Sequence, residues 1–411
     1  MSQPPAQPSV QPSVQPPVQP SVRSIASSRG VSRDRAGTLV GAGGGRPRLR
    51  GTLPGVAGVV GLAVTLGLLL GATPVPHPAV AAAAQPRAVA GNPLAGHRMG
   101  VYKGAGDQAW APYQRSRGTE RRLLAKIALR PKAKWFGGWI PNREIGSKVD
   151  KYIAASTGGD SDVLVQMTFF RMRPWEHEAC RRLPSAAEQA SYKQWVDRAA
   201  AAIGNARVAL ILQPDGPFAL CAPGGSTLPS RLIAYSTRRF STLPRTSVYI
   251  DGGASDWPSK DPAKASTILL RAGVRYARGF ALNSTHYSGT SDNIDFGTQV
   301  VAHLARKGVP NRHFVINTSS NGRPFTFNQA RGSHPDNAKV CATRTETRCV
   351  TLGIPPTTNV TSPAWHLSAA RRARAKAHVD AYLWFGRPWL FMQADPFVKS
   401  RALALARTTP F

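Results

Sequence analysis

Four apolar segments of this chain each lead into an aspartate or asparagine, and this repeated pattern constrains the fold most strongly. Residues 208–212 are five consecutive apolar residues, and Pro214 and Asp215 follow them. Three further segments end on polar residues: 247–251 on Asp251, 278–283 on Asn283 and 313–317 on Asn317. Apolar runs of this kind are typical of strands that are buried on both faces of a parallel sheet, and Pro214 ends the first of them.

Polar groups that occur only at the carboxyl ends of strands are what a parallel α/β barrel uses to build an active site. The alternative is that each Asp or Asn caps the helix after its strand. Four such ends together favour a site, and we expect Asp215 to belong to it.

Helical patterns alternate with these strands from Gly91 to the C-terminus. Residues 185–203 are amphipathic, with Trp195, Val196, Ala199 and Ile203 on one face. Further helices are predicted over residues 261–272, 293–307 and 368–378, and no internal repeat is evident. Alternation of strands and helices implies a parallel sheet. We therefore predict an α/β fold, a TIM-like (β/α) barrel with a closed parallel sheet, over residues 91–411.

The first 52 residues have a composition that cannot form a core. Pro, Gln, Ser and Val recur as Gln-Pro-Ser-Val, and such a segment buries too little surface to offset its chain entropy. We predict a disordered, Arg-containing tail over residues 1–52.

Residues 53–90 have the features of an export segment. A charge-free apolar run covers residues 53–72 and an Ala-rich stretch covers residues 79–84. Basic, apolar and small-residue regions in this order indicate an export signal, cleaved near Ala84 or Ala90. The run is also long enough to span a bilayer, so the alternative is a retained anchor with the basic tail in the cytoplasm. Both readings predict a secreted or cell-surface protein.

The charge of the chain is strongly positive, because 53 basic and 21 acidic residues give +32. Seven Arg and one Asp lie in residues 1–52, so about +26 belongs to the rest. Such a field favours anionic polymers, and a cell-envelope polymer is a candidate partner; an Arg-rich coding bias is the alternative. Nucleic acid is not expected, because the basic residues are scattered and no nucleic-acid module is recognisable.

Four cysteines suit an exported protein with two disulfides, and three pairings of Cys180, Cys221, Cys341 and Cys349 are open. The sequence contains no Gly-rich phosphate loop, no metal-ligand His/Cys spacing and no Gly-x-Ser-x-Gly elbow. We therefore expect neither a cofactor nor a metal.

Five motifs in sequence order resemble those of glycoside hydrolase family 6, the cellobiohydrolases and endoglucanases. Ile211-Leu-Gln-Pro-Asp215 is similar to the family's general-acid motif, with Gln213 where the family usually has Glu. The other four are Tyr249-Ile-Asp-Gly-Gly-Ala-Ser-Asp-Trp257, Gly279-Phe-Ala-Leu-Asn283, Val315-Ile-Asn-Thr-Ser-Ser-Asn-Gly322 and Asp380-Ala-Tyr-Leu-Trp384. Order and spacing agree from about Gly91 onward, which is about three quarters of the chain.

The resemblance implies a distorted barrel with fewer than eight strands and inverting hydrolysis of β-1,4-glucosidic bonds in cellulose or a related β-glucan. Asp215 would be the general acid. Its apolar neighbours Leu212, Pro214 and Phe218 agree with this role, because partial desolvation favours a protonated carboxyl group. Asp251 would lie beside it and bind sugar hydroxyls or hold the donor's charge state; a capping or salt-bridged Asp is the alternative.

Several residues are expected to contact the sugar, because pyranose rings stack on aromatic side chains. Trp135 resembles the family's donor-side platform, and Ser185 matches a Ser that helps to hold the attacking water. Further candidates are Trp257, Asn283, Trp384 and Trp389. Ordinary core packing is the alternative for each Trp.

The chain departs from the family near Cys180. The family has a Tyr and, directly before the Cys, an Asp; here Phe170 and Ala179 stand at these positions. Glu176 or Glu178 could supply the missing carboxylate, and His177 is a weaker candidate.

A second departure follows the last strand. Gly386 stands where the family has a Lys, and Arg387 is the candidate replacement for this cationic sugar contact. No acidic residue stands where the family has its proposed base, and Asp395 is the nearest carboxylate. Asn317 likewise replaces a family Asp, and Ala254 replaces a His.

The resemblance also implies that Cys180 is bridged to Cys221, which leaves Cys341 to pair locally with Cys349. The departures leave two alternative functions open. One is a cell-surface glycan-binding barrel with impaired catalysis, and the other is a hydrolase of a different polysaccharide.

Overall fold

The computed structural model describes residues 91–172, 180–327, 329 and 337–411. The predicted tail (1–52) and export or anchor segment (53–90) lie outside these residues, as do Glu176, His177, Glu178 and Ala179. None of the helices in the described ranges combines the length and apolarity that crossing a membrane requires.

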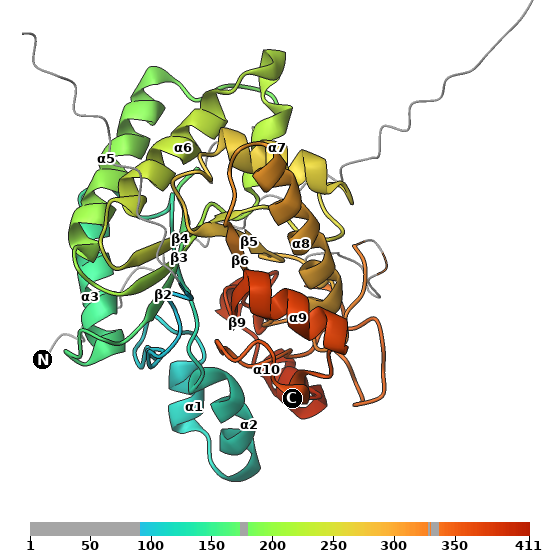
Figure 1. Ribbon diagram of the computed structural model, residues 1–411. Coiled ribbons are helices and arrows are strands. Elements are labelled where there is room, and N and C mark those ends of the chain that lie inside the picture. Colours follow the sequence, from blue (N-terminus) through green and yellow to red (C-terminus); the bar gives the residue numbers. More distant parts are fainter. Residues whose placement is uncertain (1–90, 173–179, 328, 330–336) are drawn as a thin grey trace, which may run out of the picture. The chain divides into compact units, whose positions relative to one another are not determined.

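Seven parallel strands form one sheet, and each strand pairs with its neighbours along the chain (Figure 1). The strands are β1 (Lys134–Gly137), β2 (Val165–Phe170), β3 (Val208–Leu212), β4 (Thr246–Asp251), β5 (Gly279–Leu282), β6 (His313–Asn317) and β7 (Val379–Leu383). Leu210 on β3, for example, pairs with Met167 on β2 and with Val248 on β4. The predicted parallel α/β architecture is confirmed.

The predicted closure of the sheet is overstated. Within the described part of the chain, the edge strands β1 and β7 form no ladder. The backbone N–H of Ala133 donates to the carbonyl of Trp384 (2.8 Å), and the indole N–H of Trp135 donates to the carbonyl of Phe385 (2.7 Å). Ala133 lies just before β1, whereas Trp384 and Phe385 lie just after β7. These two hydrogen bonds therefore join the start of one edge strand to the end of the other, and they do not form a ladder. The sheet is therefore a curled half-barrel with a seam.

Helices follow the strands and surround the sheet (Figure 1). They are α3 (Ile145–Thr157), α5 (Ala186–Ile203), α6 (Leu228–Ser241), α7 (Pro262–Arg271), α8 (Thr290–Arg306) and α9 (Ala369–His378). Four of them match the helices predicted from the sequence. Side chains satisfy the first backbone N–H groups of three: Ser185 and Glu188 form a capping box on α5, Asp261 caps α7 and Ser368 caps α9.

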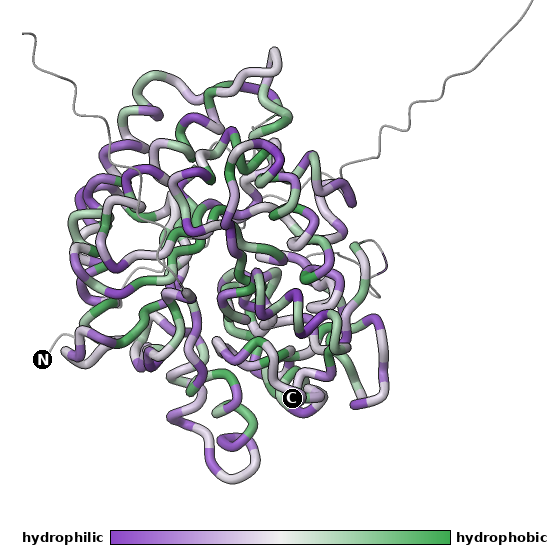
Figure 2. Tube along the Cα trace, in the orientation of Figure 1, coloured by the Kyte–Doolittle hydropathy of each residue, from purple (hydrophilic) through white to green (hydrophobic). Residues whose placement is uncertain are grey.

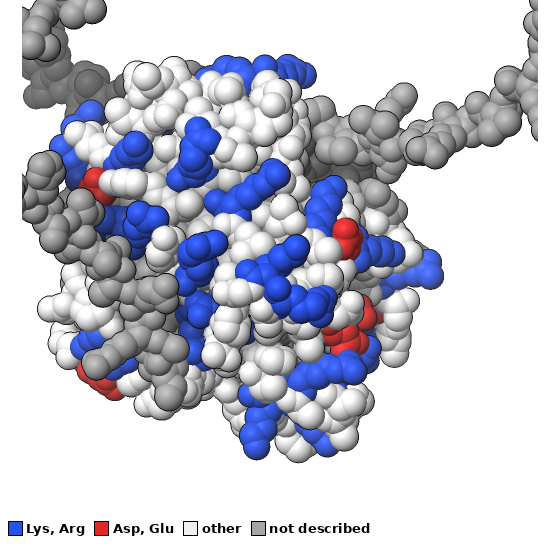
Figure 3. Space-filling model, turned by 45° about the horizontal axis from the view of Figure 1, so that its top comes forward, with Lys and Arg blue, Asp and Glu red and all other residues white. Residues whose placement is uncertain are grey.

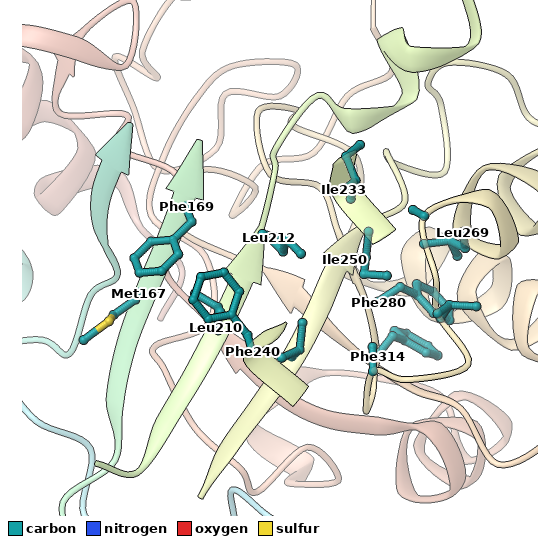
Figure 4. Close-up of a cluster of buried hydrophobic side chains, with 14 of the residues drawn as sticks. Met167, Phe169, Leu210, Leu212, Ile233, Phe240, Ile250, Leu269, Phe280 and Phe314 are labelled. Carbon is teal, nitrogen blue, oxygen red and sulfur yellow. The ribbon is translucent and has the colours of Figure 1, made fainter. Parts of the chain in front are cut away.

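The main core lies between the outer face of the sheet and these helices. Figure 4 shows its strand residues, which include Met167, Phe169, Leu210, Leu212, Ile250, Phe280 and Phe314. Trp195 of α5 is fully buried and packs edge-on against Phe169, with ring centroids 5.3 Å apart. Its indole N–H donates to the carbonyl of Ile140 (3.1 Å), so the ring is buried without an unsatisfied polar group.

The inner face of the curl is also apolar. Ala209 and Ile211 point inward, whereas Val208, Leu210 and Leu212 belong to the outer core. Burial on both faces explains why β3 is an unbroken apolar run, and Figure 2 shows hydrophobic stretches along the strands.

A buried ion pair lies beneath this inner face. Arg278 donates from Nε and Nη2 to the two carboxylate oxygens of Asp380, each over 2.9 Å, and the hydroxyl of Tyr249 donates to the same group (2.7 Å). The Asp380 side chain is 1% exposed. Burial, followed by the charge of Asp380, raises the pKa of Tyr249 well above its usual value, so Tyr249 stays a neutral donor.

A second apolar cluster joins the two ends of the described chain, and the sequence analysis did not predict it. Its helices and strands are α1 (Trp110–Arg115), α2 (Gly118–Ala128), β8 (Leu390–Phe391), β9 (Ala394–Phe397) and α10 (Lys399–Thr408). Trp384 and Trp389 lie at its centre. Short 3-10 turns complete the structure: η1 (Gly216–Cys221), η2 (Pro223–Gly225) and η4 (Pro363–Trp365).

Candidate active site

Asp215 lies just past the carboxyl end of β3, on a sharply turned backbone. Both Gln213 (φ 54°) and Asp215 (φ 60°) adopt the left-handed conformation, which is uncommon for residues other than glycine. Asp215 precedes η1, but its side chain does not cap that turn. It is partly exposed and accepts a hydrogen bond from the hydroxyl of Thr285 (2.9 Å).

Asp251, at the end of β4, is the buried partner of Asp215. It is 1% exposed, accepts a hydrogen bond from the hydroxyl of Ser284, and accepts another from the backbone N–H of Gly253 (3.3 Å). It caps no helix, because the N-cap of α7 is Asp261. The capping alternative is therefore wrong for both aspartates.

Burial of Asp251 and the negative charge of Asp215 raise the pKa of Asp251 well above its usual value. The hydrogen bonds from Ser284 and from the backbone N–H groups of Gly253 and Asp215 oppose this shift only in part. Neighbouring carboxyl groups cannot both lose their protons easily. Asp251 therefore keeps its proton to a higher pH than an isolated aspartate would.

The loop after β5 holds both carboxyl groups, and sequence reasoning missed it. Ser284 binds Asp251 and the next residue, Thr285, binds Asp215. The available signal was the pair of hydroxyl residues directly after a strand end. Their targets, however, follow from how three separate loops meet, which no local pattern reveals.

Trp257 contacts η1, which follows Asp215, and the loop after β5, which binds Asp215. Its ring lies 5.4 Å from that of Phe218 on η1 and stacks on His286 at 5.3 Å, and it is partly exposed. Nδ1 of His286 lies 3.2 Å from a carboxylate oxygen of Asp256. Burial alone would raise the pKa of Asp256, but the hydrogen bond and charge of His286 outweigh it and lower the pKa. This buried pair was not predicted from the sequence.

Trp135 and Phe170 form a second aromatic group, beside the seam. The two rings meet edge-on at 5.5 Å, and the guanidinium carbon of Arg387 lies 4.7 Å from the Trp135 ring centre. Both aromatic residues are partly exposed. Trp139, in the turn after β1, is 48% exposed and is a further candidate platform.

The packing around Gly386 leaves no space for the Lys that the resemblance would place there. A Cβ atom on Gly386 would lie 2.6 Å from Nδ2 of Asn317 and 2.7 Å from Oγ of Ser319. The side-chain oxygen of Asn317 accepts hydrogen bonds from the backbone N–H of both Phe385 and Gly386, each over 3.1 Å. A side chain at position 386 therefore has no room, and the nearest cation along the chain is Arg387.

Two predicted sugar contacts are scaffold residues. Asn283 is 0% exposed, and its amide donates to the carbonyls of Asn317 (3.0 Å) and Ser288 (3.3 Å). Trp384 is 1% exposed, donates its indole N–H to the carbonyl of Ile354 (2.9 Å) and packs near Trp389. Their burial leaves no surface for a sugar ring, so the core alternative holds for Trp384 and also for Trp389, which is 2% exposed.

Ser185 has a structural task, because its hydroxyl accepts the N–H of Glu188 in the capping box of α5. Asp395, on β9, is exposed and accepts a hydrogen bond from the amide of Gln108 (2.8 Å). The other candidate bases, Glu176 and Glu178, lie outside the described residues.

Both expected disulfides are present. Cys180 is joined to Cys221, which ends η1, and Cys341 is joined to Cys349. The first tethers the turn after Asp215 to the segment before α5. Over the described ranges, no three His, Cys, Asp or Glu residues are grouped to hold a metal ion.

Comparison with known proteins identifies the family. The sequence model described as "Glycosyl hydrolases family 6" matches residues 98–388. The chain is 32% identical over 225 residues to Endoglucanase A of Cellulomonas fimi and 30% identical over 217 residues to Endoglucanase 1 of Streptomyces halstedii. These matches cover 54% and 52% of this chain, but only 47% and 65% of the two relatives.

Solved structures show the same fold. An endoglucanase of Mycobacterium tuberculosis, solved in complex with a thio-linked cellobioside, has a TM-score of 0.60 and 24% identity, over 77% of this chain and 98% of that one. The catalytic core of a cellobiohydrolase from Chaetomium thermophilum has a TM-score of 0.57 and 16% identity, over 78% and 99%. The half-barrel is thus that of a glycoside hydrolase fold. This chain belongs to glycoside hydrolase family 6.

Proposed function

We propose that this protein hydrolyses β-1,4-glucosidic bonds in cellulose or a related β-glucan, with Asp215 as the general acid. The observation that carries the proposal is the pairing of the partly exposed Asp215 with the buried Asp251. The names of the relatives, which are endoglucanases, support the substrate class.

In this mechanism Asp215 delivers a proton to the oxygen that leaves the scissile bond. Asp251 lies too deep to reach a substrate, so it acts by setting the charge of Asp215. Thr285 orients the acid. Positioned proton transfer of this kind typically contributes about 10²–10⁴-fold to a rate.

Inversion requires a water on the opposite face of the sugar and a carboxylate about 6.5–9.5 Å from the acid. Glu176, Glu178 and Asp395 remain the candidates for this base. Trp135, Phe170 and Trp257 supply partly exposed aromatic surface on which sugar rings can stack.

The test compares the wild type with Asp215→Asn on a soluble β-1,4-glucan, with Asp150→Asn, an exposed residue of α3, as the control. We expect kcat to fall about 10²–10⁴-fold in the first variant only, and the wild-type product to have inverted anomeric configuration by NMR. A wild type that binds β-glucan without cleaving it would instead support the impaired glycan-binding barrel.

We also propose that the protein is exported, as a secreted or surface-anchored form. Its two disulfides are stable in an oxidising compartment, and Lys and Arg are spread over the face in Figure 3 with few acidic residues between them, which suits an anionic envelope polymer. N-terminal sequencing of the exported protein decides between cleavage near residues 84–90 and an anchor at 53–72.

A further inference from the structure

Arg387 is a cation whose guanidinium has no acidic partner among the described residues. Its Nε atom is buried and makes no hydrogen bond, and the group is held by stacking over Trp135 at 4.7 Å. Burial lowers the pKa of Arg387 to about 10 and Asp395 opposes this shift, so the group is charged at neutral pH. A stacked arginine in such a setting is ready to pair with an anion.

The surrounding residues fix Arg387 in place. Its backbone N–H donates to the side-chain oxygen of Gln393 (3.1 Å), and the preceding Gly386 is packed against Asn317 and Ser319. Asp395 forms no ion pair with Arg387 and is instead bound to Gln108. The position of the cation is therefore set by the fold and does not depend on a salt bridge.

Two residues, Gln393 and Thr285, connect the backbone of Arg387 to the proposed acid. Gln393, which accepts the N–H of Arg387, donates its amide to the carbonyl of Thr285 (3.3 Å), and the hydroxyl of Thr285 binds Asp215. Arg387 and its stacking partner Trp135 are thus linked to the loop that holds Asp215.

We propose that Arg387 recognises a carboxylate on the sugar, and that the preferred substrate is an acidic β-glucan that carries uronosyl groups. This inference rests on the proposed function and narrows its substrate class. A guanidinium binds a carboxylate through two parallel hydrogen bonds, whereas a neutral ring leaves its charge uncompensated. The net charge of +32 would also concentrate an acidic polymer near the protein.

The test uses a matched pair of soluble β-1,4-glucans, one oxidised at C6 to glucuronate in part of its units and one unoxidised. We expect the wild type to prefer the oxidised glucan in kcat/KM by about 10–100-fold, the range of one charged hydrogen-bonded contact. Arg387→Met should abolish this preference, and Arg387→Lys should keep part of it. Arg306→Met, an exposed residue at the end of α8, controls for general loss of charge and should keep all of it.

Binding provides a second measurement that does not need turnover. Calorimetry with the Asp215→Asn variant should give tighter binding of C6-oxidised than of neutral cello-oligosaccharides, and Arg387→Met in the same background should remove the difference. Equal cleavage and equal binding of the two glucans by the proteins that retain Arg387, or an unchanged preference in Arg387→Met, would overturn the inference. No cleavage of either glucan by the wild type would instead overturn the proposed function, and the binding comparison would still decide the role of Arg387.

Discussion

The hydroxyl of Thr285 donates a hydrogen bond of 2.9 Å to the carboxylate of Asp215. The hydroxyl of the preceding residue, Ser284, donates a hydrogen bond to the carboxyl group of Asp251. One loop therefore holds both members of the proposed acid pair, and substitutions in it and around it separate orientation, charge and packing.

Thr285→Val should reduce kcat about tenfold, because the variant keeps the shape of the side chain but loses a hydrogen bond to a charged group, which is worth about 1.5–3 kcal/mol. Thr285→Ser retains the hydroxyl and should stay near the wild type. Because the lost hydrogen bond stabilises the ionised form of Asp215, the alkaline limb of the pH–rate profile should move to higher pH in Thr285→Val only. Identical profiles for the two variants would mean that the hydroxyl has no part in catalysis.

Asp251→Asn should change how stability depends on pH. The pKa of Asp251 is raised in the folded protein, so the unfolded chain releases this proton at lower pH, near its usual value of about 4. The unfolding free energy of the wild type should then decrease as pH rises from about 4 up to the folded-state pKa of Asp251. An Asn cannot ionise, and its oxygen can accept the N–H of Gly253 while its NH₂ group faces Ser284.

Relative to the wild type, Asp251→Asn should therefore gain stability as pH increases, by about 1.4 kcal/mol for each unit of pKa shift. Urea unfolding at pH 5 and pH 9 measures this, with Asp150→Asn as the control. A parallel pH dependence for Asp251→Asn and the wild type would show that folding does not raise the pKa of Asp251.

Asp380→Asn should destabilise the fold by about 3–5 kcal/mol, because it leaves the Arg278 guanidinium buried without its counter-charge. The matched control is Arg98→Met, which breaks the ion pair between Arg98 and Asp160; those side chains are 65% and 53% exposed. Solvent screening limits such a pair to less than about 1 kcal/mol. Similar urea midpoints for the two variants would contradict a structural role for the Asp380 network.

The two disulfides should differ in their contribution to stability. Cys180 and Cys221 are 41 residues apart and Cys341 and Cys349 are 8 apart, and the entropy lost by the unfolded chain grows with the size of the closed loop. Replacing both cysteines by Ser should cost about 4 kcal/mol for the first bridge and about 2.5 kcal/mol for the second. Denaturant unfolding of the two double variants measures the two stability losses. A larger loss for the Cys341–Cys349 variant would contradict the prediction.

Gly386→Ala should cost about 1–3 kcal/mol, because the added Cβ would push into Asn317 and Ser319. Activity should fall as well, since Asn317 and Gln393 also position the chain around Thr285. Gly146→Ala is the control: it lies in α3, where the new Cβ would meet only a carbonyl at 3.8 Å. That helical site should tolerate Ala or gain stability from it, and equal melting temperatures for both variants would remove the packing argument.

The strands and their polar ends were predictable because parallel strands buried on both faces leave a strong apolar signature, as in residues 208–212. The amphipathic helix 185–203 was predictable because its apolar residues recur at helical spacing on one face. Asp215 and Asp251 were proposed from their place at strand ends, and the structure brings the two aspartates close enough for the charge of Asp215 to act on Asp251.

The remaining site residues depend on contacts between distant loops. An aromatic residue in a motif does not reveal which side it faces, and Trp384 therefore resembled a sugar platform although its indole is bonded inside the core. Ser185 stays a predicted water contact by resemblance, and its local role as a helix cap was already visible in the Ser-x-x-Glu spacing. The seam escaped prediction because alternation of strands and helices carries no information on whether the first and last strands meet.

The order of the seven strands also bears on how the polypeptide is assembled. Within the described sheet, each strand pairs with the strands that flank it along the chain. Each newly synthesised strand therefore pairs with the strand made just before it. Contacts of short sequence separation close smaller loops, which costs less entropy and speeds folding. A chain that emerges N-terminus first from a ribosome or a translocation pore can thus add its strands in sequence order. The last strand, β7, pairs with β6 and need not form a ladder with β1.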